Sequence, residues 1–258
     1  MSVLKGLTLF LLGLVFSVAG PDFRWSERMT PGQTLELKGV NGGIHALAAS
    51  GDTAEVVAKK QGRRSDPATV EIKVVPHAGG VTICAVYPSK SDRPNECAPG
   101  SGGHMETKDN DVSVDFEVKV PAGVKFVGRT VNGAIEGKDL PADAEGVTVN
   151  GGVTLSAAGL VRAATVNGSV TVDLGRADWK DELSFETVNG SLTVSLPESA
   201  STEVKARTVN GDISTDFPLT VRGRMVGRKL DGTLGSGGRS LSLETVNGSI
   251  ALRKAKGQ

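Results

Sequence analysis

The chain has 258 residues and a formal net charge of zero, from 29 basic and 29 acidic residues. This balance argues against a protein that binds nucleic acid through a basic surface, because such a surface needs an excess of positive charge. Only 4% of the residues are aromatic, while 34 are glycine, so a folded core must be filled by Val, Leu, Ile and Ala.

Residues 1–19 have the pattern of an export signal. Lys5 supplies the positive start, an apolar run follows over residues 6–19, and Ser17 and Ala19 are the small residues expected before a cut after Ala19. A membrane anchor is the alternative, but the run is shorter than the ~20 residues that span a bilayer. We predict an exported protein, either periplasmic, cell-surface or extracellular, with no membrane span in the mature chain.

Residues 20–120 are expected to form β-strands of irregular length, from segments such as "ATVEIKVVP" and "DVSVDFEVKVP". Cys84 and Cys97 are the only cysteines, and an even count in an exported chain predicts one disulfide, which would pin the polar loop between them. Two free thiols are the alternative; a metal pair is disfavoured because His77 and His104 lack ligand spacing. The region is the N-terminal part of a larger fold or, alternatively, a small separate β-domain.

Residues 121–258 carry a dense repeat of the motif Thr-Val-Asn-Gly. We predict that the Asn of every Val-Asn-Gly is a structural corner, at Asn41, Asn132, Asn150, Asn167, Asn189, Asn210 and Asn247. The segment Lys229–Leu234 aligns as a worn copy, which puts Asp231 in the Asn position. The copies from Asn132 onward then recur about every 16–22 residues, a period typical of repeat architectures.

Each copy alternates apolar and polar residues on both sides of the motif. In "LSFETVNGSLTVSL", Leu183, Phe185 and Thr187 share one face before the corner, and Leu192 and Val194 share one after it. Such alternation predicts half-buried strands. Asn-Gly accepts positive φ at both positions, which permits a sharp turn.

Two all-β architectures fit this pattern. Each Asn-Gly could close a hairpin of an antiparallel meander or barrel. Alternatively, each is a corner of a single-stranded parallel β-solenoid (β-helix), in which every turn stacks on the last. The repeat length, the recurrence of like residues and the scarcity of aromatics favour the solenoid.

The repeated "TVNG", "ETVNGSI" near the C-terminus, "VKVPAGV" and "DGTLGSGG" together resemble the bacterial putative-adhesin domains of unknown function. The resemblance covers roughly residues 33–254 and departs at residues 60–112, which lack the motif. It implies a right-handed parallel β-helix and a cell-envelope or extracellular setting. No family-wide ligand site comes with it.

Chemical motifs are scarce, and we predict no catalytic, cofactor or metal site. G-x-S-x-G, H-E-x-x-H and the Walker loop are all missing from the sequence. Asn-Gly-Ser matches a glycosylation acceptor, but its Ser belongs to the repeat. Asp109, Asp111 and Asp115 are expected to be solvated rather than to bind calcium. Glu186 and Glu244 are expected to share one column, separated by basic residues of the intervening copies, as a solvated charge ladder.

These observations predict an exported, non-catalytic β-solenoid that acts as an adhesin-like scaffold or interaction protein. Its partner would be a protein or a glycan of the cell envelope. A polysaccharide-processing β-helix enzyme is one alternative, because such enzymes share this architecture. An envelope-stress sensing module is the other.

Overall fold

The computed structural model describes residues 18–19, 22–89, 92–180, 182–221 and 229–255. These residues form an all-β protein, with one short 3-10 turn at Pro67–Thr69. The predicted signal at residues 1–19 lies outside the described residues, apart from Val18 and Ala19. Within the described part, no helix has the length and apolar character to cross a membrane.

The strands form two mostly parallel sheets of 11 strands each, named here sheet A and sheet B. Sheet A contains β1 (Val18–Ala19), β2 (Phe23–Arg28), β4 (Ile44–Ala48), β5 (Thr53–Gly62), β8 (Ser113–Val120), β10 (Ile135–Leu140), β12 (Val153–Ala157), β14 (Val170–Leu174), β16 (Leu192–Leu196), β18 (Ile213–Thr215) and β22 (Ile250–Lys254). Sheet B contains β3 (Thr34–Lys38), β6 (Glu71–His77), β7 (Gly80–Val86), β9 (Lys125–Arg129), β11 (Ala144–Val147), β13 (Val161–Ala164), β15 (Leu183–Asn189), β17 (Thr202–Asn210), β19 (Thr220–Val221), β20 (Lys229–Leu234) and β21 (Ser240–Asn247).

Each repeat contributes one strand to each sheet, and the Asn-Gly corner carries the chain from sheet B to sheet A. Strands of neighbouring repeats pair in parallel and in register, so that Val153, Val170, Leu192 and Ile250 lie in one row. The strands on either side of Asn189 pair with other repeats and not with each other. The hairpin alternative is therefore wrong for these copies.

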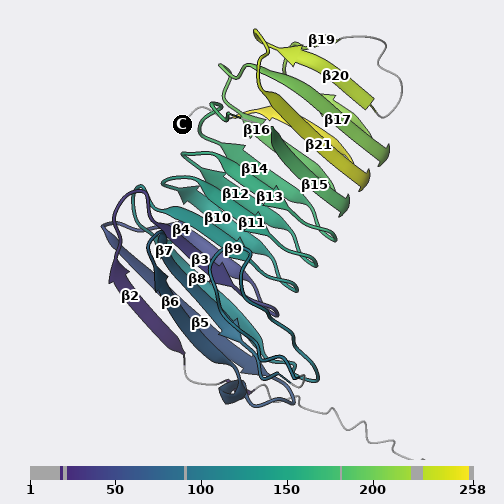
Figure 1. Ribbon diagram of the computed structural model, residues 1–258. Coiled ribbons are helices and arrows are strands. Elements are labelled where there is room, and N and C mark those ends of the chain that lie inside the picture. The colour runs from purple at the N-terminus through teal and green to yellow at the C-terminus, as the bar shows by residue number, and fades with distance from the viewer. Residues whose placement is uncertain (1–17, 20–21, 90–91, 181, 222–228, 256–258) are drawn as a thin grey trace, which may run out of the picture.

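The repeats do not stack strictly in chain order (Figure 1). At the N-terminal end, β3 and β4 lie between β7–β8 and β9–β10. At the C-terminal end, β21 and β22 lie between β15–β16 and β17–β18. The expectation that every turn stacks on the last is wrong at these two places, because a turn can accept a neighbour from any part of the chain that presents the same register.

Antiparallel strands flank the parallel stack at both ends. On the N-terminal side, β5 pairs with β2 and β8, and β6 pairs with β7. On the C-terminal side, β20 pairs antiparallel with β17 and places Asp231 opposite Lys205. The alignment that put Asp231 in the Asn position is therefore wrong. Its strand, β20, runs antiparallel to β17 and covers the edge of that strand, so Asp231 does not continue the row of corner Asn residues.

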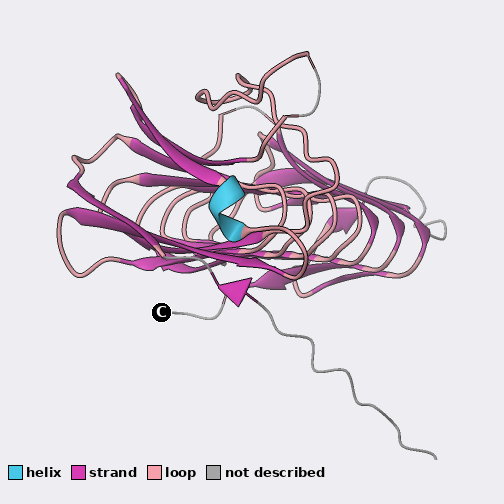
Figure 2. Cartoon of the chain, turned by 90° about the horizontal axis from the view of Figure 1, so that it is seen from below, coloured by secondary structure: helices cyan, strands magenta, loops and turns pink. Residues whose placement is uncertain are grey.

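The core lies between the two sheets and is mostly aliphatic, as the composition requires. Figure 2 shows the two layers of strands facing each other, joined by loops at the sides. Rows of buried side chains such as Leu155, Val172 and Val194 follow the stack. The largest aromatic members of the core among the described residues are Trp179, Tyr87, Phe116, Phe126 and Phe185. Residues 20–120 contribute strands to the same two sheets as the repeats.

Candidate functional site

The corners present an inner row of threonines. Thr187 is 4% exposed and lies on the core side with Leu183 and Phe185. Its Oγ1 donates to the carbonyl of Gly168 in the neighbouring repeat at 2.8 Å. The same bond, at 2.8–3.1 Å, is made by Thr130, Thr148, Thr165, Thr208 and Thr245 to the preceding glycine carbonyl in the stack. A buried hydroxyl needs such a partner, and here the bond ties adjacent repeats together.

The corners also present an outer row of asparagines, named here the Asn ladder. From Asn132 onward, each side-chain Nδ2 donates to the Oδ1 of the Asn before it in the row, at 2.8–2.9 Å. In spatial order the ladder runs Asn41, Asn132, Asn150, Asn167, Asn189, Asn247, Asn210. All seven predicted Asn corners lie in this one row, and Asp231 does not.

The corner glycines are required by close packing between repeats. A Cβ at Gly190 would fall far inside van der Waals contact with the carbonyl oxygen of Gly168, and Gly168 meets Gly151 in the same way. The expected positive φ is found at the corner glycines Gly42 (116°) and Gly151 (158°), but at no Asn of the repeat and at none of the other five corner glycines within the described residues. Glycine is therefore used here because the backbones of stacked corners approach each other directly.

The valine of the motif points outward. Six of these valines are 38–55% exposed, whereas Val40, in the first copy, is buried. They form one row along sheet B, named here the valine stripe: Val131, Val149, Val166, Val188, Val246 and Val209. At ~4.8 Å per strand, six valines extend over ~24 Å. The stripe is a continuous row of exposed apolar side chains.

A groove of about 960 Å³ runs beside the valine stripe. Its walls come from residues 147–149, 164–166, 186–188, 207–209 and 244–246, with Lys229. Glu186 and Glu244 do share a column in it, as expected from the sequence. They are direct neighbours, however, and Arg207 lies beyond Glu244 at 4.0 Å. The predicted alternation of acidic and basic residues along this column is therefore wrong, because β21 lies between β15 and β17 and places Glu244 directly beside Glu186.

A second groove, of about 710 Å³, crosses the outer face of sheet A. It is lined by residues 45–47, 136–138, 154–156 and 171–173 and by Ser195. At one end, His45 Nδ1 lies 3.3 Å from Glu136 Oε2. Burial, and then the neighbouring Asp139, raise the pKa of Asp173 above its ordinary value. Hydroxyl groups and a few charges therefore lie among apolar side chains such as Leu47 in this groove.

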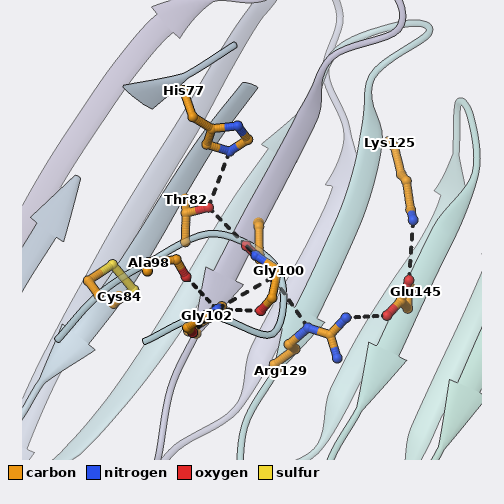
Figure 3. Close-up of polar contacts among 12 residues, drawn as sticks. His77, Thr82, Cys84, Ala98, Gly100, Gly102, Lys125, Arg129 and Glu145 are labelled. Carbon is orange, nitrogen blue, oxygen red and sulfur yellow. Dashed lines mark hydrogen bonds and ion pairs between the residues drawn. A yellow bond between two sulfur atoms is a disulfide. The ribbon is translucent and has the colours of Figure 1, made fainter. Parts of the chain in front are cut away.

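A buried charge network lies on sheet B near the disulfide (Figure 3). Glu36 is 4% exposed and accepts hydrogen bonds from Thr82 Oγ1 and the Gly100 amide, each at 2.9 Å. Arg129 Nε lies 3.3 Å from Glu36, and the same guanidinium pairs with Glu145. The buried carboxylate is thus fully paired, as a buried charge must be.

The loop held by the disulfide folds over this network. Cys84 and Cys97 are bonded, as the cysteine count predicted. Lys38 Nζ donates to the carbonyls of Ala98 and Gly100 at 2.5 and 2.6 Å. Burial lowers the pKa of Lys38, and Arg129 adds to this while Glu36 opposes it. The network holds the loop in place, because Lys38 donates to loop carbonyls and Glu36 accepts from the Gly100 amide.

The remaining sequence candidates are dispersed. Asp111 accepts backbone bonds from Arg64 and Ser65, which lower its pKa, and Asp115 accepts one from Gly43. Across the described ranges, no three His, Cys, Asp or Glu side chains gather closely enough to hold a metal ion. These aspartates anchor turns.

Sequence reasoning missed the network around Glu36 and the outward valines. Glu36 and Lys38 alternate with Leu35 and Leu37, which looks like any solvated strand face until a distant loop covers it. The outward orientation of the valines could have been predicted from the alternation of the strand, because Val188 is three residues after the buried Phe185 and therefore lies on the opposite face.

Comparison with curated proteins finds no match. Among solved structures, a putative cell adhesion protein from Clostridium sporogenes is 12% identical, with 91% of this chain and 100% of that chain covered and a TM-score of 0.45. A putative adhesin from Bacteroides fragilis is 12% identical, with 91% and 97% covered and a TM-score of 0.33. A family model, Toastrack DUF4097, matches residues 104–253, which is more than half of the chain. The chain belongs to the Toastrack DUF4097 family.

Proposed function

We propose that the protein is an exported, non-catalytic scaffold that presents its long sheet faces to other molecules of the cell envelope. In this proposal the two sheets are the walls of a right-handed, single-stranded β-solenoid. Residues 1–19 are its cleaved signal, residues 20–120 its N-terminal part and residues 121–258 its regular repeat. The bond between Cys84 and Cys97 supports export, since disulfides persist in oxidising compartments.

The valine stripe is the observation that carries this proposal. Isolated exposed apolar side chains are ordinary, but a contiguous row is typical of an interaction surface. Valine at these positions adds little to the core, because the inner face of each corner is occupied by Thr. A threonine in the outer row would keep the β-branched shape and give a polar surface.

The chemistry of the stripe indicates the kind of partner. Apolar side chains run beside the amides of the Asn ladder, and Glu186, Glu244 and Arg207 lie on the other side. An apolar ridge on a protein, flanked by polar groups of mixed charge, fits such a surface. A contact between neighbouring valines would also stabilise the sheet, so the test must separate binding from stability.

The groove on sheet A favours a second ligand class, a glycan. Thr154 and Thr171 lie side by side in its row, and Ser156 and Asp173 lie in the next. Hydroxyl and carboxylate groups in such rows can exchange hydrogen bonds with sugar hydroxyls. This groove lacks the aromatic side chains on which sugar rings commonly stack, so we rank it second.

The enclosed state of the charge network supports a non-catalytic role. Thr82 is fully buried and Glu36 nearly so, and the loop from Ala98 to Gly102 covers Lys38. Incubating the purified protein with polysaccharides and measuring released reducing or unsaturated ends checks this part. Release of such ends would overturn it.

Two reciprocal triple variants test the scaffold proposal. Val149→Thr, Val166→Thr and Val188→Thr make three consecutive positions of the six-valine stripe polar while keeping their shape. Thr154→Val, Thr171→Val and Thr193→Val make the inverse change at three positions that lie in one row of sheet A. Both are compared with wild type in pull-downs from envelope extracts, on a glycan array and in thermal melts. We expect the first triple to lose its protein partners with little change in Tm, and the second to retain them.

The opposite outcomes are informative. If the first triple captures the same partners and melts at a lower temperature, the stripe only stabilises the sheet and the proposal fails. Loss of glycan binding in the second triple alone would instead favour the glycan candidate.

A further inference from the structure

Seven Asn-Gly pairs make this chain chemically unusual. In such a pair the backbone nitrogen of the glycine can attack the Asn side-chain Cγ. The Cγ–Nδ2 bond breaks, ammonia leaves with the backbone proton, and a succinimide ring forms. Water then opens the ring to Asp or isoaspartate, so that the net reaction consumes one water and releases one ammonia.

The backbone amides of six of the seven glycines donate hydrogen bonds to the neighbouring repeat. Each donates to the main-chain carbonyl of the next Asn in the ladder at 2.8–2.9 Å. The donors are Gly42, Gly133, Gly151, Gly168, Gly190 and Gly248. A hydrogen-bonded amide held in this way must first be released before its nitrogen can attack, because the attack needs the nitrogen to lose its proton and turn toward Cγ.

Gly211 is the exception. Asn210 ends the ladder: its Nδ2 donates to Asn247 Oδ1, and its carbonyl accepts from Gly248. The repeat that would follow was expected to place Asp231 next in the row, but its segment runs antiparallel to β17 instead. Within the described ranges, the Gly211 amide therefore finds no acceptor.

Solvent exposure does not distinguish the pairs. The side chains of Asn132, Asn189 and Asn210 are all exposed, and Gly133, Gly190 and Gly211 are all half-buried. The residue after Asn is glycine in every copy, so the local steric freedom for ring closure is the same. The state of the glycine amide is the feature that sets the last pair apart.

We propose that Asn210 is a site of spontaneous deamidation through Gly211, and that the stack protects the other six Asn residues of the ladder. The need to release one backbone hydrogen bond lowers the reactive population by about twofold to tenfold. The protected sites should therefore react at least that much more slowly than Asn210 while the protein is folded.

The test uses the folded, unmodified protein, with the other six pairs as internal controls. The protein is incubated at mildly alkaline pH, sampled over days and digested, and each Asn-Gly peptide is quantified by mass spectrometry for Asp and isoaspartate. A parallel sample is incubated in denaturant. We expect the Asn210 peptide to convert first in the folded sample, and all seven to convert at similar rates in the denatured one.

Two results would overturn the proposal. One is equal conversion of Asn210 and Asn189 in the folded protein. The other is preferential conversion of Asn210 in the denatured sample as well, which would assign the effect to the neighbouring Asp212 rather than to the stack. The variant Asn210→Gln serves as a check on intact mass, because it should remove the early modified species and leave the slow ones.

Discussion

Replacing Asn189 by Ala removes two rungs of the Asn ladder at its middle. The side chain donates to Asn167 Oδ1 and accepts from Asn247 Nδ2, each at 2.8 Å. At about 0.5–1.5 kcal/mol per hydrogen bond, the free energy of unfolding should fall by about 1–3 kcal/mol. Because each bond polarises the next along a chain of amides, we expect the upper part of this range.

In a chain of this size, 1 kcal/mol shifts Tm by about 2–4 °C, so Asn189→Ala should lower Tm by about 2–12 °C, in the upper part of that range. Differential scanning calorimetry is the assay. Ser195→Ala is the matched control, since Ser195 lies on β16, which follows the same corner, and its side chain makes no hydrogen bond to another described residue. A Tm equal to that of the control, together with lost partner binding, would refute the structural role of the ladder.

Three further predictions follow from the same structure. Thr187→Val should lower the free energy of unfolding by about 1–2 kcal/mol, because it leaves the Gly168 carbonyl without its donor, whereas Val188→Thr at the neighbouring exposed position should be nearly neutral. Urea denaturation measures both variants, and equal losses would contradict the assignment of Thr187 to the core side and Val188 to the outer side. Burial raises the pKa of Tyr87 to about 12, so the unfolded chain releases the phenol proton near pH 10 while the native state keeps it, and the free energy of unfolding should fall as pH rises above ~10. The variant Tyr87→Phe should lose less Tm at alkaline pH than the wild type, and an identical dependence of Tm on pH would contradict this prediction. Replacing both Cys84 and Cys97 by Ser removes the disulfide and should lower the free energy of unfolding by about 3 kcal/mol in the chain-entropy model. The denaturant midpoint should then be lower than that of the oxidised wild type, and an identical midpoint would show that the loop is held without the disulfide.

The strand pattern and the corners could be predicted from the sequence because both depend on local rules. Alternation at Leu183, Phe185 and Thr187 places these side chains on one face, and they are buried together. The Asn residues recur at one position of each repeat, so that parallel stacking in register brings them into one row. The disulfide followed from the cysteine count alone.

The order of stacking could not be predicted in the same way. Every repeat offers nearly the same edge, so the sequence of β21 fits equally well beside β15 or β17, and in the fold it pairs with both. The error at Asp231 has a related cause: "KLDGTL" has the alternation of a repeat, but alternation carries no information about strand direction. The direction is set by pairing with β17.

The charge network around Glu36 depends on a tertiary contact that no local pattern shows. Its partners Thr82, Gly100 and Arg129 come from three different segments. Glu117 and Lys119 on β8 have the same spacing as Glu36 and Lys38, but both are exposed.

The placement of β21 and β22 has a consequence for how the chain reaches its final form. Among the described strands, the turn formed by β17 and β18 pairs with the parallel stack through β21 and β22. A chain emerging from a ribosome or a secretion channel therefore cannot complete its rod by simple addition from one end. The position between β15–β16 and β17–β18 stays unfilled until β21 and β22 have been made, so these two strands complete the two sheets.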